Sequence, residues 1–346
     1  MIDALRDVSG TAPSRGNPKL AVAGFPFPDE LAVAVGLDPV NLLDLGDARD
    51  AALEEIWIDD KEDKDVRSVF IRAMRGELAD FRGLVSTRTL DHAHYYLREA
   101  LRLGAWNDPR PLHILDIMPL QGDGFARYNR RAIDRLVDFL ERVSGVRLDD
   151  AALRDAVERK NQQRATWRAL AEKRSRRMMR GAHAFAALPE QREPAEKRCE
   201  GPRLMLVTSR SLHDARLHAL VEATGWIVTA EDDGTARFIP ADDLVPGDDP
   251  LTAIASYYAH LPTALAHPRE ARSNHILERA AAHDIDGVLF WAHRNDMRLG
   301  WDIPSLQREL DGYGIPSAMV RCDSGTDEGA EALRDTAARL LARVAR

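Results

Sequence analysis

Carboxylate and imidazole side chains stand three or four residues apart at several places in this 346-residue chain. Three of these pairs are Asp91 with His94, Asp214 with His218, and His293 with Asp296. Residues at this spacing share a helix face, so each pair could transfer a proton or bind a divalent cation. Such pairs also arise by chance on solvated helices, and the spacing alone leaves both interpretations open.

Cationic side chains follow several apolar runs that are predicted to be strands. They are Arg88, Arg210, Arg237, His293 and Arg294. Guanidinium groups bind phosphate and carboxylate oxygens in pairs, so as a group these residues suit an anionic ligand, although each alone also suits a solvated surface. The turn Gln121-Gly122-Asp123-Gly124 follows a further apolar run and fits either a ligand-facing turn or simply a tight turn.

Short apolar runs alternate with amphipathic helical patterns along most of the chain. The runs are 84–86, 112–115, 204–207, 227–229, 288–291 and 318–320. Near-continuous apolar strands between helices are typical of parallel sheets covered on both faces. The sequence therefore predicts an α/β fold, with its polar turns at the carboxyl edges of the sheets, where such folds bind ligands.

One stretch of sequence occurs twice. Residues 84–93 and 206–215 both read as an apolar strand, a hydroxyl-rich turn and the start of a helix, which predicts two similar halves. Thr89 and Ser211 are good N-cap residues, so each turn is expected to present free backbone N–H groups at the sheet edge.

Composition divides the chain into segments. Residues 1–17 are expected to form a loose arm, followed by a first lobe over 18–124 and a helical region over 125–188. A proline-containing linker over 189–202 then leads into a second lobe over 203–346. Within the helical region, Gly145 is expected to end one helix and Asp149-Asp150 to begin the next.

Charge and cysteine content narrow the classes of function. A net charge of −8 argues against a nucleic-acid protein, and no apolar run approaches the about 18 residues of a membrane span. With no apolar signal core at the N-terminus, the expectation is a cytoplasmic protein. Cys199 and Cys322 belong to no C-x-x-C pair or Cys/His cluster, so neither a disulfide framework nor a metal site is predicted.

Several segments resemble the 2-hydroxyacyl-CoA dehydratase and benzoyl-CoA reductase family. Residues 25–40 resemble its P-x-E-L-x-x-A-x-G-x-x-P opening, and the similarity extends, in order, to about residue 344. The resemblance implies two Rossmann-like lobes with parallel sheets joined by a helical region, in a two-subunit enzyme acting on CoA thioesters. It also implies a [4Fe–4S] cluster held by about three thiolates, and an ATP-dependent activator that supplies single electrons.

The family's cysteines are missing from this chain. Their places fall on Leu90, on Asp233 in the Asp233-Gly234 turn, and on Asn295. At the second place the cysteine is expected to be deleted, so an aliphatic side chain, a gap and an amide stand where such a cluster requires soft thiolate ligands. We therefore expect no cofactor on this chain and a [4Fe–4S] cluster on the partner subunit.

The first hypothesis is a cluster-free subunit that pairs with a cysteine-bearing paralogue in a heterodimer and helps to shape an acyl-CoA pocket. Its predicted substrate-binding residues are Arg88, Asp91, Gln121, Asp123, Arg210, Arg237 and His293. Two alternatives stay open: a stand-alone enzyme that uses Asp/His acid–base groups on an acyl-CoA or small anion, and a non-catalytic scaffold. No P-loop, G-x-G-x-x-G fingerprint or nucleophile elbow supports other chemistry.

Overall fold

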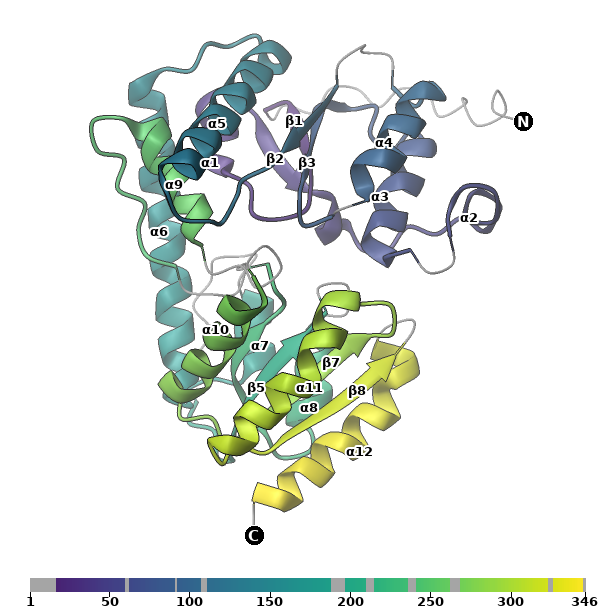
Figure 1. The fold of residues 1–346 in the computed structure, drawn as a ribbon, viewed down its shortest axis with the longest axis vertical. Coiled ribbons are helices and arrows are strands. Elements are labelled where there is room, and N and C mark those ends of the chain that lie inside the picture. The colour runs from purple at the N-terminus through teal and green to yellow at the C-terminus, as the bar shows by residue number, and fades with distance from the viewer. Residues whose placement is uncertain are drawn as a thin grey trace. The chain divides into compact units, whose positions relative to one another are not determined.

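The computed structural model describes residues 17–59, 62–90, 92–106, 111–187, 197–209, 215–235, 241–261, 268–322 and 326–344. It contains two four-stranded parallel sheets with helices packed on them (Figure 1), which confirms the predicted α/β fold with two lobes. The chain forms two compact units. Unit 1 comprises Met1–Lys160 and Leu244–His260, and unit 2 comprises Asn161–Asp243 and Leu261–Arg346. The lobe and linker boundaries predicted from composition stay predictions.

The sheet of unit 1 has the strand order β2-β1-β3-β4. Its strands are β1 (Lys19–Ala23), β2 (Asp38–Asn41), β3 (Phe81–Thr87) and β4 (Leu112–Leu115). Its helices are α1 (Asp29–Ala34), η2 (Leu42–Leu45), α2 (Ala51–Trp57), α3 (Lys64–Met74), α4 (Ala93–Arg102), α5 (Asp123–Ser144) and α9 (Pro250–His260). Helices α3 and α4 cover one face of the sheet, and α1 and α5 cover the other (Figure 1).

The sheet of unit 2 has the corresponding order β6-β5-β7-β8. Its strands are β5 (Arg203–Thr208), β6 (Ile227–Asp232), β7 (Gly287–His293) and β8 (Ser317–Cys322). Its helices are α7 (Gly181–Ala187), α8 (Ala215–Glu222), α10 (Arg269–Ala282), α11 (Met297–Gly312) and α12 (Thr326–Val344). The long helix α6 (Asp150–Ser175) begins in unit 1 and ends in unit 2.

The two halves are similar in topology, but the repeated sequence stretch does not mark equivalent strands. Residues 84–87 end β3, whereas residues 206–208 end β5. By strand order, β3 corresponds to β7 and β5 corresponds to β1. The repeat therefore reflects a shared local pattern of strand, turn and helix, and the structural equivalents of the β3 turn are the residues that follow β7.

Capping residues mark the end of α5 and the start of α6. Gly145, with a φ of 73°, adopts the left-handed conformation that ends α5. Asp149 accepts a hydrogen bond from the backbone N–H of Ala152 at 3.0 Å, at the start of α6. Both predicted boundaries are confirmed. Helix α9, which comes between β6 and β7 in sequence, packs against α5 in unit 1, where Tyr258 Oη donates to Glu30 Oε2 at 2.7 Å.

The side chains of β7 point alternately into two apolar clusters, one on each face of the sheet of unit 2. Leu289 and Trp291 face the cluster formed with α8 and α12, whereas Val288, Phe290 and Ala292 face the cluster formed with α10 and α11. Successive side chains of a strand point to opposite faces, so a run that is buried on both faces must be apolar throughout. Every residue of β7 is buried.

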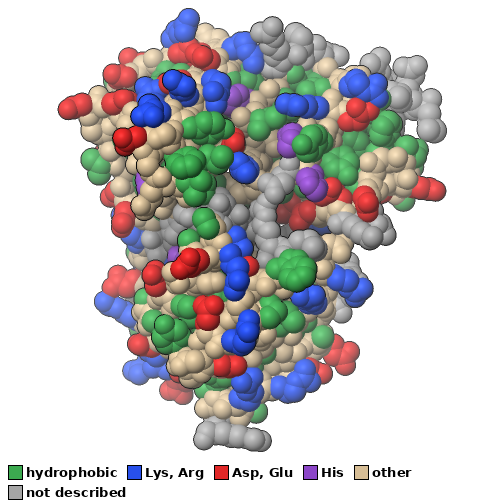
Figure 2. All heavy atoms as spheres, viewed as in Figure 1, with side chains coloured by type: hydrophobic (Ala, Val, Ile, Leu, Met, Phe, Trp, Pro, Cys, Tyr) green, Lys and Arg blue, Asp and Glu red, His purple; other side chains and the backbone are tan. Residues whose placement is uncertain are grey.

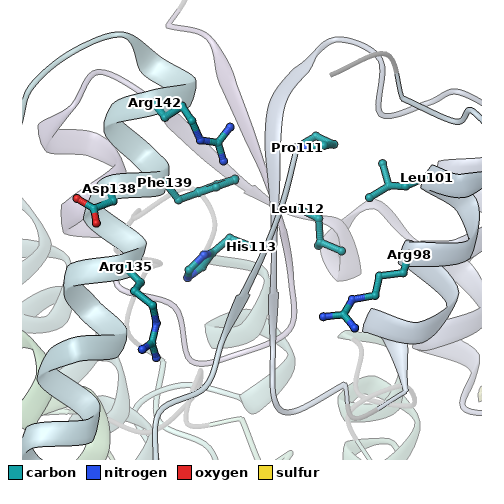
Figure 3. A pocket seen from close by; sticks show the side chains of 9 residues that line it. All are labelled: Arg98, Leu101, Pro111, Leu112, His113, Arg135, Asp138, Phe139 and Arg142. Carbon is teal, nitrogen blue, oxygen red and sulfur yellow. The ribbon is translucent and has the colours of Figure 1, made fainter. Parts of the chain in front are cut away.

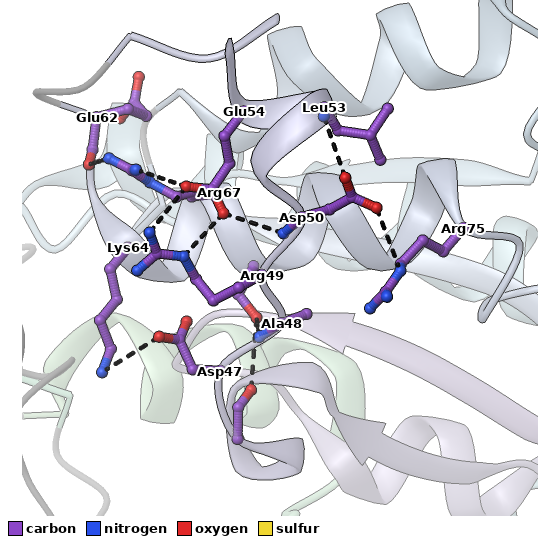
Figure 4. A network of polar contacts seen from close by, with 12 residues as sticks. Asp47, Ala48, Arg49, Asp50, Leu53, Glu54, Glu62, Lys64, Arg67 and Arg75 are labelled. Atoms are coloured by element: carbon purple, nitrogen blue, oxygen red, sulfur yellow. Dashed lines mark hydrogen bonds and ion pairs between the residues drawn. The ribbon is translucent and has the colours of Figure 1, made fainter. Parts of the chain in front are cut away.

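Charged side chains position the segment around α2 and α3 (Figure 4). Glu54 Oε1 accepts from Arg49 Nε at 2.8 Å, and its Oε2 accepts from Arg67 Nη1 at 3.1 Å. The hydrogen bond from Arg49 is the main cause that lowers the pKa of Glu54 to about 2. Asp50 caps α2 by accepting from the backbone N–H of Leu53 at 3.2 Å. Elsewhere, acidic and basic side chains are intermixed on the visible face of each unit (Figure 2).

Close packing of α12 on the sheet predicts a large effect of one methyl group. A Cβ added at Gly329 would overlap the indole of Trp291, which is fully buried. Gly329→Ala is expected to lower the free energy of unfolding by about 1–3 kcal/mol, although alanine is the better helix former. The matched control is Gly124→Ala in α5, where a Cβ meets nothing within 4 Å and a gain of up to about 1 kcal/mol is expected. Urea unfolding measures both, and a Gly329→Ala variant as stable as the parent would contradict this packing.

Candidate functional site

Each sheet reverses its strand order once, and that point is where open α/β sheets bind ligands, outside the carboxyl ends of the strands. In unit 1 the reversal lies between β1 and β3, and in unit 2 it lies between β5 and β7. We call these places the first and second switch points. The turns that follow β1 and β3 therefore form the candidate site of unit 1, and the turns that follow β5 and β7 form the candidate site of unit 2.

Hydroxyl groups join the two turns of the first switch point. The backbone N–H of Phe25 donates to Thr89 Oγ1 at 2.9 Å, and Thr87 Oγ1 donates to the carbonyl of Phe25 at 3.2 Å. Gly24 has a φ of 106°, and a Cβ there would overlap both threonine hydroxyls. Only glycine allows this approach. The prediction that Thr89 caps the next helix is wrong, because α4 begins after His92 and Thr89 instead binds the β1 turn.

Arg88 is held at the carboxyl edge of the first sheet by an ion pair. Its Nη1 lies 3.1 Å from Oδ1 of Asp116, which follows β4, and Tyr128 Oη donates to the other carboxylate oxygen at 2.8 Å. Burial and the hydrogen bond to Asp116 raise the pKa of Tyr128. Asn129 fixes the same turn by bonding both the N–H and the carbonyl of Met118 at 2.8 Å. The Arg88 side chain remains 55% exposed, so it is oriented and accessible to an anion.

The start of α5 combines backbone N–H groups with apolar side chains. Gly122 precedes the helix with a φ of 118°, and Gln121 and Asp123 beside it are exposed. Leu120, Phe125 and Tyr128 are exposed by 37–38% and add apolar surface to this stretch. This edge of unit 1 can therefore contact both an anionic group and an apolar one.

Ser209 and Asp296 connect the strands of the second switch point. Ser209 Oγ donates to Asp296 Oδ2 at 2.5 Å and accepts from the backbone N–H of His293 at 3.0 Å. The other oxygen of Asp296 accepts from the N–H of Leu299 at 2.9 Å and caps α11. The serine hydroxyl is thus directed to the carboxylate and not to an imidazole, which is not the arrangement of a Ser-His nucleophile.

The turn after β6 carries two buried carboxylates. Asp232 Oδ1 accepts from the N–H of Gly234 at 2.6 Å, and Asp233 Oδ1 accepts from Thr235 Oγ1 at 2.6 Å. The second oxygen of each side chain is buried and has no hydrogen-bond partner among the described residues, although Asp232 Oδ2 lies 3.4 Å from His275 Nε2. Buried carboxylate oxygens without a hydrogen bond are uncommon in proteins.

The family model of the 2-hydroxyglutaryl-CoA dehydratase D-component matches residues 25–341. The chain belongs to this family. Membership confirms the resemblance noted at the opening segment, and it supports a dehydratase-type subunit. A D-component implies a partner subunit. No protein of curated function matches the chain.

The three positions that lack cysteine occupy different surroundings in this member of the family. Leu90 is only 7% exposed and belongs to the apolar core with Phe70 and Leu97. Asp233 is buried in the β6 turn, and Asn295 donates its backbone N–H to His293 Nδ1 at 3.2 Å. Leu90 and Asn295 follow equivalent strands, at the first and second switch points.

The side chains present do not fit a thiolate-held cluster. The Leu90 side chain is packed among hydrocarbon, and the other two positions offer oxygen or an amide. Cys322 is buried at the end of β8, paired in register with His293, and Cys199 is half-buried with its thiol bonded to the carbonyl of Lys197. Within the described residues no group of three or more His, Cys, Asp or Glu side chains could hold a metal ion.

The predicted binding residues divide between the two switch points. Arg88, Gln121 and Asp123 lie at the edge of unit 1, and His293 lies at the edge of unit 2 and is 7% exposed. Asp91, Arg210 and Arg237, together with Ser211 and Asp214, fall outside the described residues. No helix in the described part of the chain is both long and apolar enough to cross a membrane.

One residue of each of two predicted Asp/His pairs, His218 and Asp296, is described with another partner. His218 is fully buried, with Nε2 2.5 Å from Glu231 Oε2 on β6, so its described partner is a strand residue. Asp296 is committed to Ser209 and to the cap of α11. The buried group of Arg174, His218 and Glu231 was missed because helix spacing reveals only neighbours on the same helix.

Proposed function

We propose that this D-component is a cluster-free subunit of a complex resembling the 2-hydroxyacyl-CoA dehydratases and benzoyl-CoA reductases. It pairs with a cysteine-bearing paralogue, which holds the [4Fe–4S] cluster and carries the one-electron chemistry. The observation that carries this proposal is Leu90, whose side chain is part of the apolar core at a position where the family has a thiolate. Filling the position with hydrocarbon stabilises the lobe and leaves the redox centre to the partner.

The acyl-CoA pocket of the proposed complex includes the first switch point. Arg88 supplies an accessible guanidinium for a phosphate or thioester oxygen, and its ion pair with Asp116 limits its movement. The exposed side chains Leu120 and Phe125 lie at the start of α5 and suit the acyl chain or an apolar surface of the partner. At the second switch point the proposed binding residue is His293, the last residue of β7, which is 7% exposed.

The alternative of a stand-alone acid–base enzyme finds less support. Both oxygens of Asp296 are engaged by Ser209 and by the helix cap, and the carboxylate that pairs with His218 is buried in the core of unit 2. A general base must reach the proton that it abstracts. Neither Glu231 nor Asp296 is exposed for that purpose, and Asp91 and Asp214 fall outside the described residues.

Anaerobic purification with and without a co-expressed cysteine-bearing paralogue tests the proposal. The isolated chain is expected to contain less than about one iron ion, and the heterodimer is expected to contain about four, all retained by the partner. About four iron ions in the isolated chain, or a failure of the two chains to co-purify, would contradict the proposal. Turnover by the isolated chain in air would instead favour the stand-alone enzyme.

Within the complex, Arg88→Gln is expected to weaken binding of a CoA thioester by about tenfold, through loss of one charge-assisted contact. Arg102→Gln is the matched control, because Arg102 is also an exposed arginine in an ion pair, with Glu99 at the far end of α4. Isothermal titration with the same thioester measures both variants. Equal affinities of the two variants for the thioester would contradict a role of Arg88 in binding it.

A further inference from the structure

A second cleft lies at the outer edge of the first sheet, beside β4 (Figure 3). It has a volume of about 500 Å³, which is within the size range of small-molecule sites. Side chains of α4, β4 and α5 line it, all of them in unit 1. The cleft adjoins the first residues of β4, whereas Asp116 and the first switch point lie beyond the last residue of that strand. It is therefore separate from the candidate site described above.

Alternation along β4 gives the cleft two kinds of wall. Leu112 points to the α4 side, together with Leu101 and Arg98, and His113 points to the α5 side (Figure 3). The rings of His113 and Phe139 are stacked, with centroids 5.2 Å apart and planes inclined by 30°. Phe139 can lie this close to the sheet because β3 has glycine beneath it: a Cβ at Gly83 would be 2.8 Å from Phe139 Cζ. The cleft thus has an aromatic wall and an aliphatic wall.

Three arginines and one carboxylate set the charge of this cleft. Arg98, Arg135 and Arg142 line it with Asp138, which leaves an excess of two positive charges. Among the described residues, no carboxylate forms an ion pair with Arg98 or Arg135. Arg142 lies over the Phe139 ring, with its Cζ 5.1 Å from the ring centroid. Burial, followed by the charges of Arg135 and Arg142, lowers the pKa of His113 to about 4, so at neutral pH its ring adds a flat face and no charge.

We propose that this cleft binds a small organic anion that carries about two negative charges on a planar body. The guanidinium groups of Arg98 and Arg135 bind the anionic oxygens, and the planar part lies against the Phe139 and His113 wall. A phosphate monoester of a nucleoside and an aromatic dicarboxylate share this chemistry. In this proposal the cleft is a binding site distinct from the acyl-CoA pocket.

Isothermal titration of the full-length chain with four probes tests the requirement for both charge and plane. AMP combines a phosphate with a base, isophthalate combines two carboxylates with a ring, adenosine has the base alone, and inorganic phosphate has the charge alone. Saturable binding with a dissociation constant below about 1 mM is expected for AMP or isophthalate, and at least tenfold weaker binding for adenosine and phosphate. Tighter binding of AMP would identify the ligand as a phosphate monoester, and tighter binding of isophthalate would identify it as a dicarboxylate.

Variants locate the bound probe. The double substitution Arg98→Gln with Arg135→Gln is expected to weaken binding at least tenfold, and Arg127→Gln, on the same helix but outside the cleft, is expected to change it less than twofold. All three arginines are exposed, so folding is not at risk. Absence of saturable binding by both AMP and isophthalate, or unchanged binding in the double variant, overturns the proposal. Loss of binding in Arg88→Gln alone would place the probe at the first switch point and also overturns it, without affecting the proposed function.

Discussion

Replacing Glu231 by alanine is expected to lower the free energy of unfolding by about 3–5 kcal/mol, because it leaves a buried charge without its partner. Glu231 is fully buried on β6 and pairs through one oxygen with Arg174 of α6 and through the other with His218 of α8. The exposed fractions of the Arg174 and His218 side chains are 7% and 0%. Without Glu231, the guanidinium would have to remain in the core uncompensated or be exposed by partial unfolding.

A neighbouring cation makes the stability of unit 2 more dependent on the Glu231 carboxylate. Arg279 of α10 is half-buried; desolvation lowers its pKa, and its Nη2 lies 3.5 Å from the backbone carbonyl of Glu231. Two guanidinium groups therefore lie close to one strand end, where Glu231 and Asp232 supply the opposing charge. Removal of one of the two carboxylates leaves repulsion between the cations in a region from which water is excluded.

An exposed ion pair of unit 2 provides the matched control. Arg176 and Glu172 are one helical turn apart, with 71% and 59% of their side chains exposed. Glu172→Ala is expected to change the unfolding free energy by less than about 1 kcal/mol, because water and salt screen such pairs. Urea unfolding at neutral pH compares the two variants. A loss below about 1 kcal/mol in Glu231→Ala would show that water or structural relaxation compensates Arg174 without the carboxylate.

The sequence predicts the strands better than it predicts which side chains contact one another. All six apolar runs became strands, because buried parallel strands require continuous apolar residues. Two strands were not predicted. β1 is as apolar as the others but lies directly after the polar N-terminal segment, and β2, Asp38–Asn41, is an edge strand that contains proline. Nothing in the periodicity of β2 distinguishes it from a turn.

The candidate site was predictable in position but not in detail. The order of strands and turns is enough to place Arg88 and His293 at carboxyl edges, as predicted for α/β sheets. The bond from Phe25 to Thr89 joins residues 64 positions apart, so a local cap was the only role that sequence could suggest for this threonine. The same limit applies to Leu90, where loss of a cysteine is visible in the sequence but its replacement by core packing is not.

Substitution of Asp296 by alanine is expected to lower the free energy of unfolding by about 2–4 kcal/mol. Loss of the N-cap of α11 accounts for about 0.5–2 kcal/mol. The buried hydroxyl of Ser209 then loses its acceptor, which costs about 1–3 kcal/mol more. Because Ser209 also accepts from the backbone N–H of His293, the second switch point is expected to loosen, with faster hydrogen exchange at that amide.

Asp149→Ala separates the cap from the hydroxyl contact. Asp149 precedes α6 and accepts from the N–H of Ala152 at 3.0 Å, and its side chain is exposed, so the cap contribution is what this substitution removes. A double-mutant cycle of Ser209→Ala with Asp296→Ala then isolates the contact between the two side chains. A coupling energy of about 1 kcal/mol or more is expected. A coupling near zero, with Asp296→Ala no more harmful than Asp149→Ala, would mean that Asp296 acts only as a helix cap and that Ser209 holds the His293 turn without it.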